Sequence, residues 1–487
     1  MLLHYCEHGA ALVKFYTNFF MRGNYVVVRG YDHGSRFTDR IEYKPTLYVP
    51  AKQMTDWQAY DGQFLEPIKF GSIRDARDFV QNYSDVDGFS IFGSTLYDYV
   101  CVHENFTQDY DTEFVKVVNI DIEVASDDGF PDPVAATKPV TAITASIGGA
   151  YYTFGFGEYN NTNENVTYIQ CENERHLLQN FIAHWRHWDA DIITGWNVQF
   201  FDIPYLYNRI TRVLSEKDAK KLSPVGMTNE RDVQIMNRTQ REVELIGMST
   251  LDYLELYKKF TYSQQESYRL DHIASVELGE RKLDYSEVET LHQLYKLDYQ
   301  KFIEYNIKDV ELVNRLEDKM KLIDMAFAIA YDAKVNYNDV FTQVRMWDVL
   351  IHNWLYDRKK IIPPKVAKSK NAQYAGAYVK DPQVGMHEWV MSFDLNSLYP
   401  HLIMQYNISP DTFIEERYED VTIEELLDGK MYREDGLCMA ANGRFFSTKK
   451  QGFLPEMMEK MYNDRVIAKK KMLEAQALLE EVNRRLK

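Results

Sequence analysis

The sequence predicts a multi-domain α/β protein, and three observations lead to this prediction. The chain has 487 residues, enough for about three domains at the usual length of roughly 150 residues each. Hydrophobic residues make up 45% of the chain, so it can bury several cores. Short alternating apolar runs at 25–29 and 46–49 are typical of strands, and the pattern at 73–83 is typical of a helix.

Composition excludes several classes of protein and of site. No apolar run approaches the roughly 18 residues that a membrane-spanning helix needs, and the N-terminus lacks the basic start and long apolar core of a signal peptide. We therefore expect a cytoplasmic protein without a membrane partner. The 4 cysteines are far apart and form no CxxC pair, so neither a disulfide framework nor a zinc site is predicted.

The net charge of -17 argues against a protein that simply coats nucleic acid, because non-specific binding depends on neutralising phosphates. It does not exclude an enzyme that acts on nucleic acid. Metal-binding carboxylates and acidic outer surfaces lower the total charge while a DNA-binding track stays basic.

Residues 1–112 are predicted to form a small α/β domain without a catalytic motif. Its many aromatic side chains are expected in the core, in preference to a base-stacking surface. Residues 323–365 also carry few catalytic signals. We expect them to fold back onto the N-terminal domain.

The first chemical signal is an apolar strand pattern at 114–124 that contains two acidic residues. Asp121 and Glu123 are two residues apart, so they project from the same face of a strand. Two carboxylates on one apolar face repel each other unless a positive group compensates. A divalent metal is the economical choice.

Two later segments supply further polar groups. Residues 192–204 are predicted to form a second apolar strand and a turn that carries Asn197 and Asp202. Tyr305 and Asp309 are four residues apart, which places both on one face of a helix. Ordinary surface carboxylates on three separate elements are the alternative interpretation.

The segment 390–403 has the pattern of an apolar strand that turns sharply into a helix. Asp394 follows the strand-forming residues at 390–393, and Ser397 and Pro400 are typical of turns and helix starts. A carboxylate at the end of a strand is a suitable metal ligand. A capping aspartate at a simple turn is the alternative.

The string Asp394-Leu-Asn-Ser-Leu-Tyr-Pro400 closely resembles motif A (DxxSLYP) of the family B DNA polymerases. The three earlier pieces resemble, in the family's order, the Exo I (DIE), Exo II (NxxxFD) and Exo III (YxxxD) motifs of 3'-to-5' exonucleases with an RNase H-like fold. Four short matches in the correct order rarely arise by chance. The resemblance begins at about Lys14 and points to the T-even phage branch of the family.

The resemblance implies a proofreading exonuclease site with two Mg²⁺ ions, for which Mn²⁺ can substitute. Two oxygen-ligated ions about 4 Å apart can activate water and hold the leaving 3'-oxygen. Tyr305 would orient the attacking water through a neutral hydroxyl with an ordinary pKa. The implied metal ligands are Asp121, Glu123, Asp202 and Asp309.

Further positions match DNA contacts of the family. Phe130 would lie beside the terminal base, and a buried loop anchor is the alternative for this residue. The segment 233–245 is predicted to be a β-hairpin, which in the family parts primer from template. The turn at 374–377 resembles a loop that holds the template strand. The implied DNA-binding residues are Phe130, Asn197, Arg241, Tyr374 and Gly376.

The implied polymerase site combines motif A with a helix predicted at 456–486. Asp394 would bind both catalytic Mg²⁺ ions, and Tyr399 would pack under the nucleotide sugar, where a ribose 2'-hydroxyl clashes. Arg465 and Lys469 share one helix face and would grip the triphosphate of a dNTP, although a solvated charged helix is the alternative. The implied nucleotide-binding residues are Leu395, Ser397, Leu398, Tyr399, Arg465 and Lys469.

The resemblance divides the chain into four parts. They are an N-terminal domain at 1–112 completed by about 323–365, an exonuclease domain at 113–322, a partial palm at 366–451 and a partial fingers helix at 452–487. The family's motifs B and C are absent from the sequence. We therefore expect either a truncated product or a split polymerase whose second polypeptide carries motifs B and C and the thumb.

The predicted function is that of the N-terminal part of a replicative DNA polymerase, with a complete exonuclease site and no synthesis by this chain alone. Its implied partners are primer-template DNA, single-stranded DNA, dNTPs, the second polypeptide and a sliding clamp bound through it, in the cytoplasm of an infected host cell. The alternatives are a stand-alone 3'-5' exonuclease and a non-catalytic nucleic-acid-binding scaffold. Motif A argues against the first, and the intact carboxylate set argues against the second.

Overall fold

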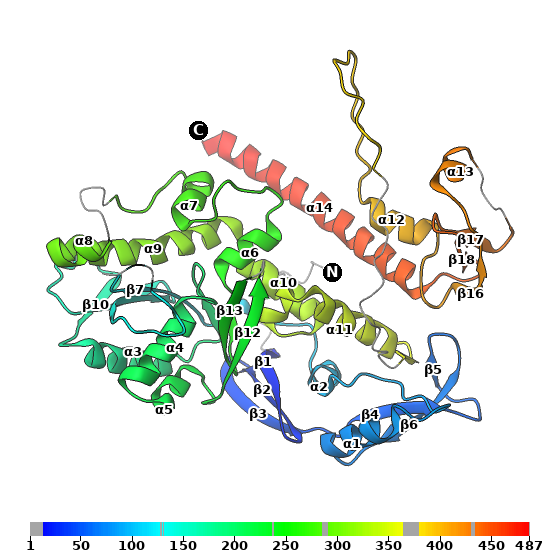
Figure 1. Ribbon diagram of the computed structural model, residues 1–487, viewed down its shortest axis with the longest axis horizontal. Coiled ribbons are helices and arrows are strands. Elements are labelled where there is room, and N and C mark those ends of the chain that lie inside the picture. The colour runs from blue at the N-terminus through cyan, green and yellow to red at the C-terminus, as the bar shows by residue number, and fades with distance from the viewer. Residues whose placement is uncertain are drawn as a thin grey trace.

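The computed structural model describes residues 13–126, 129, 131–235, 238–284, 291–363, 379–429 and 434–486. Figure 1 shows an N-terminal, a central and a C-terminal region that each contain a sheet, with the long C-terminal helix α14 (Phe453–Leu486) crossing the upper part of the view. The predicted multi-domain α/β fold class is confirmed. No helix in the described part of the chain is long and apolar enough to cross a membrane.

The central unit is a six-stranded sheet in the order β10-β9-β8-β7-β11-β14. β7 is antiparallel to β8 and parallel to β11. The C-terminal part of β7, which carries Asp121 and Glu123, therefore lies near the C-terminal end of β11. The strands are β7 (Val117–Val124), β8 (Val140–Ile147), β9 (Ala150–Gly155), β10 (Val166–Gln170), β11 (Ile192–Thr194) and β14 (Ser249–Thr250).

Helices cover both faces of this sheet. One core joins apolar β7 and β8 side chains to α3 (Glu174–Trp188) and α4 (Asp202–Val213). A smaller core joins Ala142 of β8 to α8 (Leu291–Leu297) and α9 (Tyr299–Met320). The sheet therefore presents the opposite face of β7 to α9, which positions the site described below.

The remaining elements of this region surround the sheet. They are the short helices α5 (Glu216–Ala219) and η2 (Lys220–Leu222), the hairpin β12 (Thr228–Ile235) and β13 (Arg238–Leu245), and the helices η1 (Thr112–Phe114), α6 (Tyr253–Phe260) and α7 (Leu270–Leu278). The predicted hairpin is confirmed, because β12 and β13 pair antiparallel along their whole length.

The N-terminal region contains an antiparallel sheet β1-β2-β3 and a second sheet in the order β15-β5-β6-β4. The distant strand β15 pairs parallel with β5, so residues near 360 return to the N-terminal region. The elements are β1 (Lys14–Arg22), β2 (Tyr25–Asp32), β3 (Ser35–Glu42), β4 (Thr46–Pro50), β5 (Trp57–Ala59), β6 (Phe64–Lys69), β15 (Lys360–Ile361), α1 (Ile73–Tyr83) and α2 (Tyr97–Asn105).

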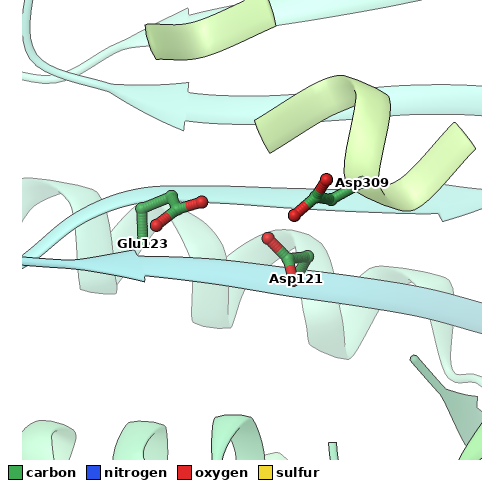
Figure 2. Close-up of side chains that lie close together, drawn as sticks. All are labelled: Asp121, Glu123 and Asp309. Atoms are coloured by element: carbon green, nitrogen blue, oxygen red, sulfur yellow. The ribbon is translucent and has the colours of Figure 1, made fainter. Parts of the chain in front are cut away.

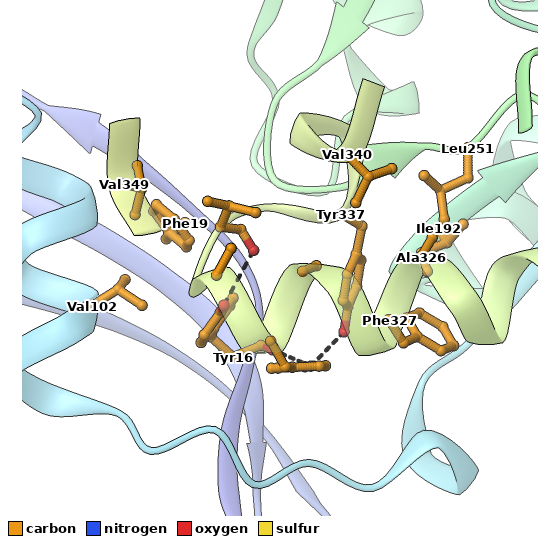
Figure 3. Close-up of a cluster of buried hydrophobic side chains, with 14 of the residues drawn as sticks. Tyr16, Phe19, Val102, Ile192, Leu251, Ala326, Phe327, Tyr337, Val340 and Val349 are labelled. Carbon is orange, nitrogen blue, oxygen red and sulfur yellow. Dashed lines mark hydrogen bonds between the residues drawn. The ribbon is translucent and has the colours of Figure 1, made fainter. Parts of the chain in front are cut away.

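One large core joins this region to α10 (Leu322–Ala333), η3 (Tyr337–Phe341) and α11 (Gln343–Tyr356). Figure 3 shows Tyr16 and Phe19 of β1 packed among side chains of these later elements. The buried Tyr331 hydroxyl donates to the Tyr16 carbonyl at 2.6 Å, and Tyr16 donates to the Val335 carbonyl at 3.1 Å. Satisfying these buried hydroxyls ties the segment after α9 to the first strand.

The C-terminal region consists of α12 (Leu398–Gln405), a small sheet β16-β18-β17, α13 (Ile423–Leu427) and α14. The strands are β16 (Phe413–Tyr418), β17 (Leu437–Met439) and β18 (Arg444–Ser447). Phe453 and Met457 at the start of α14 pack on Leu355 of α11. The helix begins at Phe453, three residues before the predicted start.

The strand predicted at 390–393 is wrong. Val390, Met391 and Phe393 form no strand and are 75%, 79% and 85% exposed. A strand needs a neighbouring strand to bond its backbone groups. Among the described residues no strand pairs with this segment, so its strand-forming side chains do not produce a strand.

Candidate metal centre

Three carboxylates from two elements meet at the face of β7 that is covered by α9. Asp121, Glu123 and Asp309 each offer one oxygen, and these oxygens all lie within 4.8 Å of one another. Figure 2 shows Asp121 and Glu123 projecting from the strand toward Asp309 on the helix. The three acidic groups therefore form a cluster that can hold a metal ion.

Local structure explains why the two strand residues share this face. Side chains alternate along a strand, and Ile120 and Ile122 point into the opposite core at 1% and 5% exposure. Asp121 and Glu123 must then face α9. On α9, Tyr305 and Asp309 are one turn apart and both are buried, as the spacing predicts.

Asp202, the first residue of α4, lies beside this cluster. It is 4% exposed, and its Oδ1 accepts the Ile122 N–H at 3.1 Å. It is not one of the three residues whose oxygens lie within 4.8 Å of one another. The loop before it is held by buried Asp252, whose carboxylate accepts the N–H groups of Asn197 and Gln199 at 3.1 Å and 2.9 Å.

Two residues that the sequence analysis did not single out orient the carboxylates. Asn306 donates to Asp121 Oδ2 at 2.6 Å, and its own oxygen accepts from Thr144 at 2.6 Å. Lys282 forms a salt bridge with Asp309 and donates to the Tyr305 hydroxyl at 3.2 Å. The requirement for a cation near clustered carboxylates is the one signal that could have indicated such a lysine.

Burial controls the protonation of the cluster. It is the main reason that the pKa of Asp121 is raised well above its ordinary range, with Asp309 and Glu123 adding to the effect. Burial and then Asp309 raise the pKa of Glu123 to about 8, and burial raises the pKa of Asp202 to about 7. Without a metal ion, the cluster therefore binds protons near neutral pH.

Tyr305 stays a neutral phenol in this setting. Burial, followed by the Asp309 charge, raises its pKa above the ordinary value, although Lys282 opposes the shift. The ordinary pKa expected for this hydroxyl is therefore wrong, and the shift is in the direction that preserves the hydroxyl proton. Burial lowers the pKa of the Lys282 ammonium, but the nearby Asp309, Tyr305 and Asp121 together raise it above its ordinary value, which keeps the side chain charged.

The donor set suits a hard divalent cation. All three clustered groups are carboxylates, and oxygen ligands are what such ions prefer. Asp309 Oδ1 is buried and has no hydrogen-bond partner among the described residues. A buried acceptor without a donor is costly, and a bound cation would satisfy it.

We expect Glu123→Gln to stabilise the metal-free protein at pH 8. The pKa of Glu123 is raised from 4.5 to about 8 in the folded state, so between these values the unfolded chain binds fewer protons and stability falls as pH rises. The amide cannot ionise, and the variant should lose this decline. Thermal unfolding in EDTA should give a Tm several degrees above wild type at pH 8, since ~1 kcal/mol corresponds to roughly 2–4 °C at this domain size.

The matching measurement uses Mg²⁺. Adding it at pH 8 should raise the Tm of the wild type and have a smaller effect on Glu123→Gln, because the variant lacks one charged ligand. At pH 5 in EDTA the two proteins should unfold at similar temperatures. A variant less stable than wild type at pH 8 would contradict the metal-centre interpretation.

The predicted DNA-binding residues are only partly described. Asn197 has a left-handed backbone with φ 69° in the loop before α4. Arg241 on β13 pairs with Asp232 at 3.1 Å and Glu230 at 3.8 Å, both on the facing strand β12. Phe130, Tyr374 and Gly376 lie outside the described residues.

Helix α12, which begins within motif A, lies on the other side of Figure 1 from β7 and α9, the elements that carry the carboxylate cluster. Arg465 of α14 donates to the Ser397 hydroxyl at 2.7 Å, so the structure brings these two predicted nucleotide contacts together. Asp394 and Lys469 are exposed. Exposure is also high for Leu395 (68%), Leu398 (40%) and Tyr399 (75%).

Two family models match the chain, one over a part that contains β7 and one over a part that contains motif A. The family model described as "DNA polymerase family B, exonuclease domain" matches residues 94–273, and that described as "DNA polymerase family B" matches residues 339–483. Asp309 lies outside both ranges. The distances in the structure join it to Asp121 and Glu123.

Several polymerases resemble the chain along most of its length. The DNA-directed DNA polymerase of Escherichia phage RB69 is 33% identical over 95% of this chain and 54% of its own length. That of Enterobacteria phage T4 is 32% identical over 94% and 54%. The DNA polymerase catalytic subunit of Elephantid herpesvirus 1 is 26% identical over 65% and 32%. The chain thus spans about half the length of the phage relatives.

Proposed function

Because the chain belongs to DNA polymerase family B, we propose that it hydrolyses nucleotides from the 3' end of DNA at the cluster of Asp121, Glu123 and Asp309. The observation that carries this proposal is the approach of these three carboxylates from a strand and a helix to within 4.8 Å. A family B exonuclease domain model covers the strand that bears two of them.

In this proposal Mg²⁺ is the natural ion and Mn²⁺ can replace it. Asp121, Glu123 and Asp309 would hold it, with Asp202 as a further ligand. Bound metal would lower the pKa of a water molecule and stabilise negative charge on the phosphate. The surrounding polar residues are already in place to orient these ligands before DNA arrives.

The residues around the metal ligands have separate tasks. Tyr305 keeps its proton, so its hydroxyl can orient the attacking water. Lys282 contacts both Tyr305 and Asp309 and holds them in one arrangement. Asn306 does the same for Asp121. Fixed groups of this kind lower the reorganisation needed at the moment of reaction.

We further propose that the exonuclease serves proofreading during DNA replication. Residues 113–322 would form the exonuclease domain, and residues 1–112 with about 323–365 would form the N-terminal domain. The pairing of β15 with β5 supports that second grouping. The hairpin with Arg241, the loop with Asn197 and, beyond the described residues, Phe130, Tyr374 and Gly376 would contact DNA.

The C-terminal region, at 366–451 and 452–487, would supply part of a polymerase site. Asp394 is its metal ligand, and Arg465 with Lys469 would bind the dNTP triphosphate beside Ser397 and Tyr399. The Arg465–Ser397 hydrogen bond supports the pairing of α14 with motif A. Synthesis would require motifs B and C and the thumb from additional polypeptide, through which a sliding clamp would also bind. The setting would be the cytoplasm of an infected host cell.

The test of the proposed function is end-specific degradation by the purified chain. A single-stranded DNA labelled at its 5' end should be shortened stepwise from the 3' end with Mg²⁺ or Mn²⁺ and remain intact with EDTA. An RNA of the same sequence and a DNA with a blocked 3' end serve as controls. Absence of shortening, or shortening from the 5' end, would contradict the proposal.

A further inference from the structure

A series of hydrogen-bonded side chains connects the β12–β13 hairpin to the loop that precedes Asp202. Gln199 in that loop donates from Nε2 to Glu242 Oε1 on β13 at 2.8 Å. The other oxygen, Glu242 Oε2, accepts from Arg231 Nε on β12 at 2.6 Å. Gln199, Glu242 and Arg231 together are called the hairpin link.

Glu242 lies where the hairpin leaves the body of the protein. The next residues on β13, Val243 and Leu245, are buried in the core that contains α4. Toward the tip, the ion pairs of Arg241 join the two hairpin strands to each other. A two-stranded hairpin is marginally stable by itself, so its last contact with the body sets its direction.

The burial of Glu242 shows that this contact is built into the structure. The residue is 8% exposed, and each of its carboxylate oxygens has a donor. A buried carboxylate is tolerated only when it is hydrogen-bonded or paired. Removing the Gln199 donor would leave one buried oxygen of Glu242 without a hydrogen bond. The hairpin would avoid this free-energy cost by turning away from the loop that carries Gln199.

The other end of the link is fixed independently. Buried Asp252 accepts the backbone N–H groups of Asn197 and Gln199 at 3.1 Å and 2.9 Å. The loop backbone, and Asp202 after it, should therefore keep their place when only the Gln199 side chain is changed. Loss of the link should move the hairpin and leave the carboxylate centre intact.

We propose that Glu242 is a positioning residue that fixes the direction of the hairpin relative to the carboxylate centre. This inference rests on the proposed 3'-end hydrolysis. A 3' end in a duplex must be unpaired before it can reach buried carboxylates, and a hairpin held beside the site can keep the two strands apart. A free single strand has no such requirement. The link therefore governs excision from duplex ends.

The test compares two DNA substrates, using variants of the 487-residue chain. Gln199→Glu places a second carboxylate against Glu242 and breaks the link by repulsion. It should lower the rate on a blunt duplex by about tenfold, the scale of a lost charged hydrogen bond, and leave the rate on the same strand alone within about twofold. The exchange variant Q199E/E242Q restores an amide–carboxylate pair, and the duplex rate should return.

A matched control is available on the same strand face. Glu244 is two residues from Glu242 and accepts from Asn229 on β12 at 3.3 Å, a bond within the hairpin. Glu244→Gln should leave both rates unchanged. Equal loss of both rates in Gln199→Glu, no loss of either, or failure of the exchange to restore the duplex rate would overturn the role of Glu242. A wild-type chain that cannot degrade single-stranded DNA would instead refute the proposed function and this inference with it.

Discussion

The double variant Asp121→Ala, Glu123→Ala is expected to lose 3'-end hydrolysis by at least about a thousandfold, equivalent to about 4 kcal/mol of transition-state stabilisation. Both side chains project from β7 into the carboxylate cluster, so the change removes two of its three members. Asp309 would remain with Lys282, and that pair is close to neutral. Such a centre has little attraction for a divalent cation.

The fold should survive this change. The two carboxylates have raised pKa values because the protein buries them at a cost, so their removal relieves repulsion near neutral pH. Asp121 also accepts from Asn306, and loss of that bond offsets part of the gain. We expect a Tm in EDTA equal to or above that of the wild type.

The measurements are the rate of 3'-end shortening, Mg²⁺ or Mn²⁺ binding by calorimetry, and the Tm. Glu480→Ala, Glu481→Ala on exposed α14 removes the same charge at a distance and should keep the full rate. Hydrolysis at the wild-type rate by the Asp121, Glu123 variant would exclude this cluster as the active centre. If this variant lost activity and also unfolded, the expectation of an intact fold would be wrong and the two carboxylates would have a structural role.

The cluster could be predicted because its members obey short-range periodicity. A spacing of two residues on a strand and of four on a helix decides which face a side chain takes, whatever the rest of the fold does. Asp121, Glu123, Tyr305 and Asp309 all fall under this rule. Their meeting across β7 and α9 was indicated by the resemblance, and the coordinates supply the distance.

Lys282 and Asn306 could not be predicted in the same way. Lys282 lies in an irregular segment after α7, and its reach to Asp309 depends on how that segment folds over α9. Asn306 shares α9 with the motif residues, but an asparagine beside a tyrosine carries no distinct pattern. Its role follows only from its contacts with Asp121 and Thr144.

The strand predicted at 390–393 is wrong because strand formation depends on pairing with a distant segment, which local periodicity does not reveal. Strand propensity reflects how well a side chain packs on a paired, half-buried surface, and pairing is a long-range property. Val390 and Phe393 have suitable side chains but no strand beside them in the described part of the chain. The sequence pattern there describes what the segment can form when a partner strand is present.

A two-metal polymerase site needs at least two carboxylates, and under the proposed function motif A would supply one, Asp394. We expect no measurable primer extension from the 487-residue chain alone. Polypeptide that adds motifs B and C, as a continuation of this chain or as a partner, should restore it by pairing with the exposed segment at 390–393 and with α14.

In that complete enzyme, Asp394→Ala should abolish primer extension and leave 3'-end hydrolysis unchanged. Asp394 is exposed in the C-terminal region and is not one of the clustered carboxylates, so under the proposed function the two activities would use different ligands. Asp381→Ala removes the same charge from the same exposed segment and should extend primers normally. Tyr399→Ala should admit ribonucleotides, because the ring that would exclude a 2'-hydroxyl is gone.

The deciding measurement is template-directed extension and 3'-end trimming by each variant on the same labelled primer. A thousandfold loss of extension with full trimming in Asp394→Ala would separate the two centres, since each tenfold change is about 1.4 kcal/mol at one site. Loss of both activities would mean that Asp394 also supports the exonuclease region. Robust synthesis by the purified 487-residue chain would show that a second metal-binding carboxylate of the polymerase site is already present within it, contrary to the expected need for motif C.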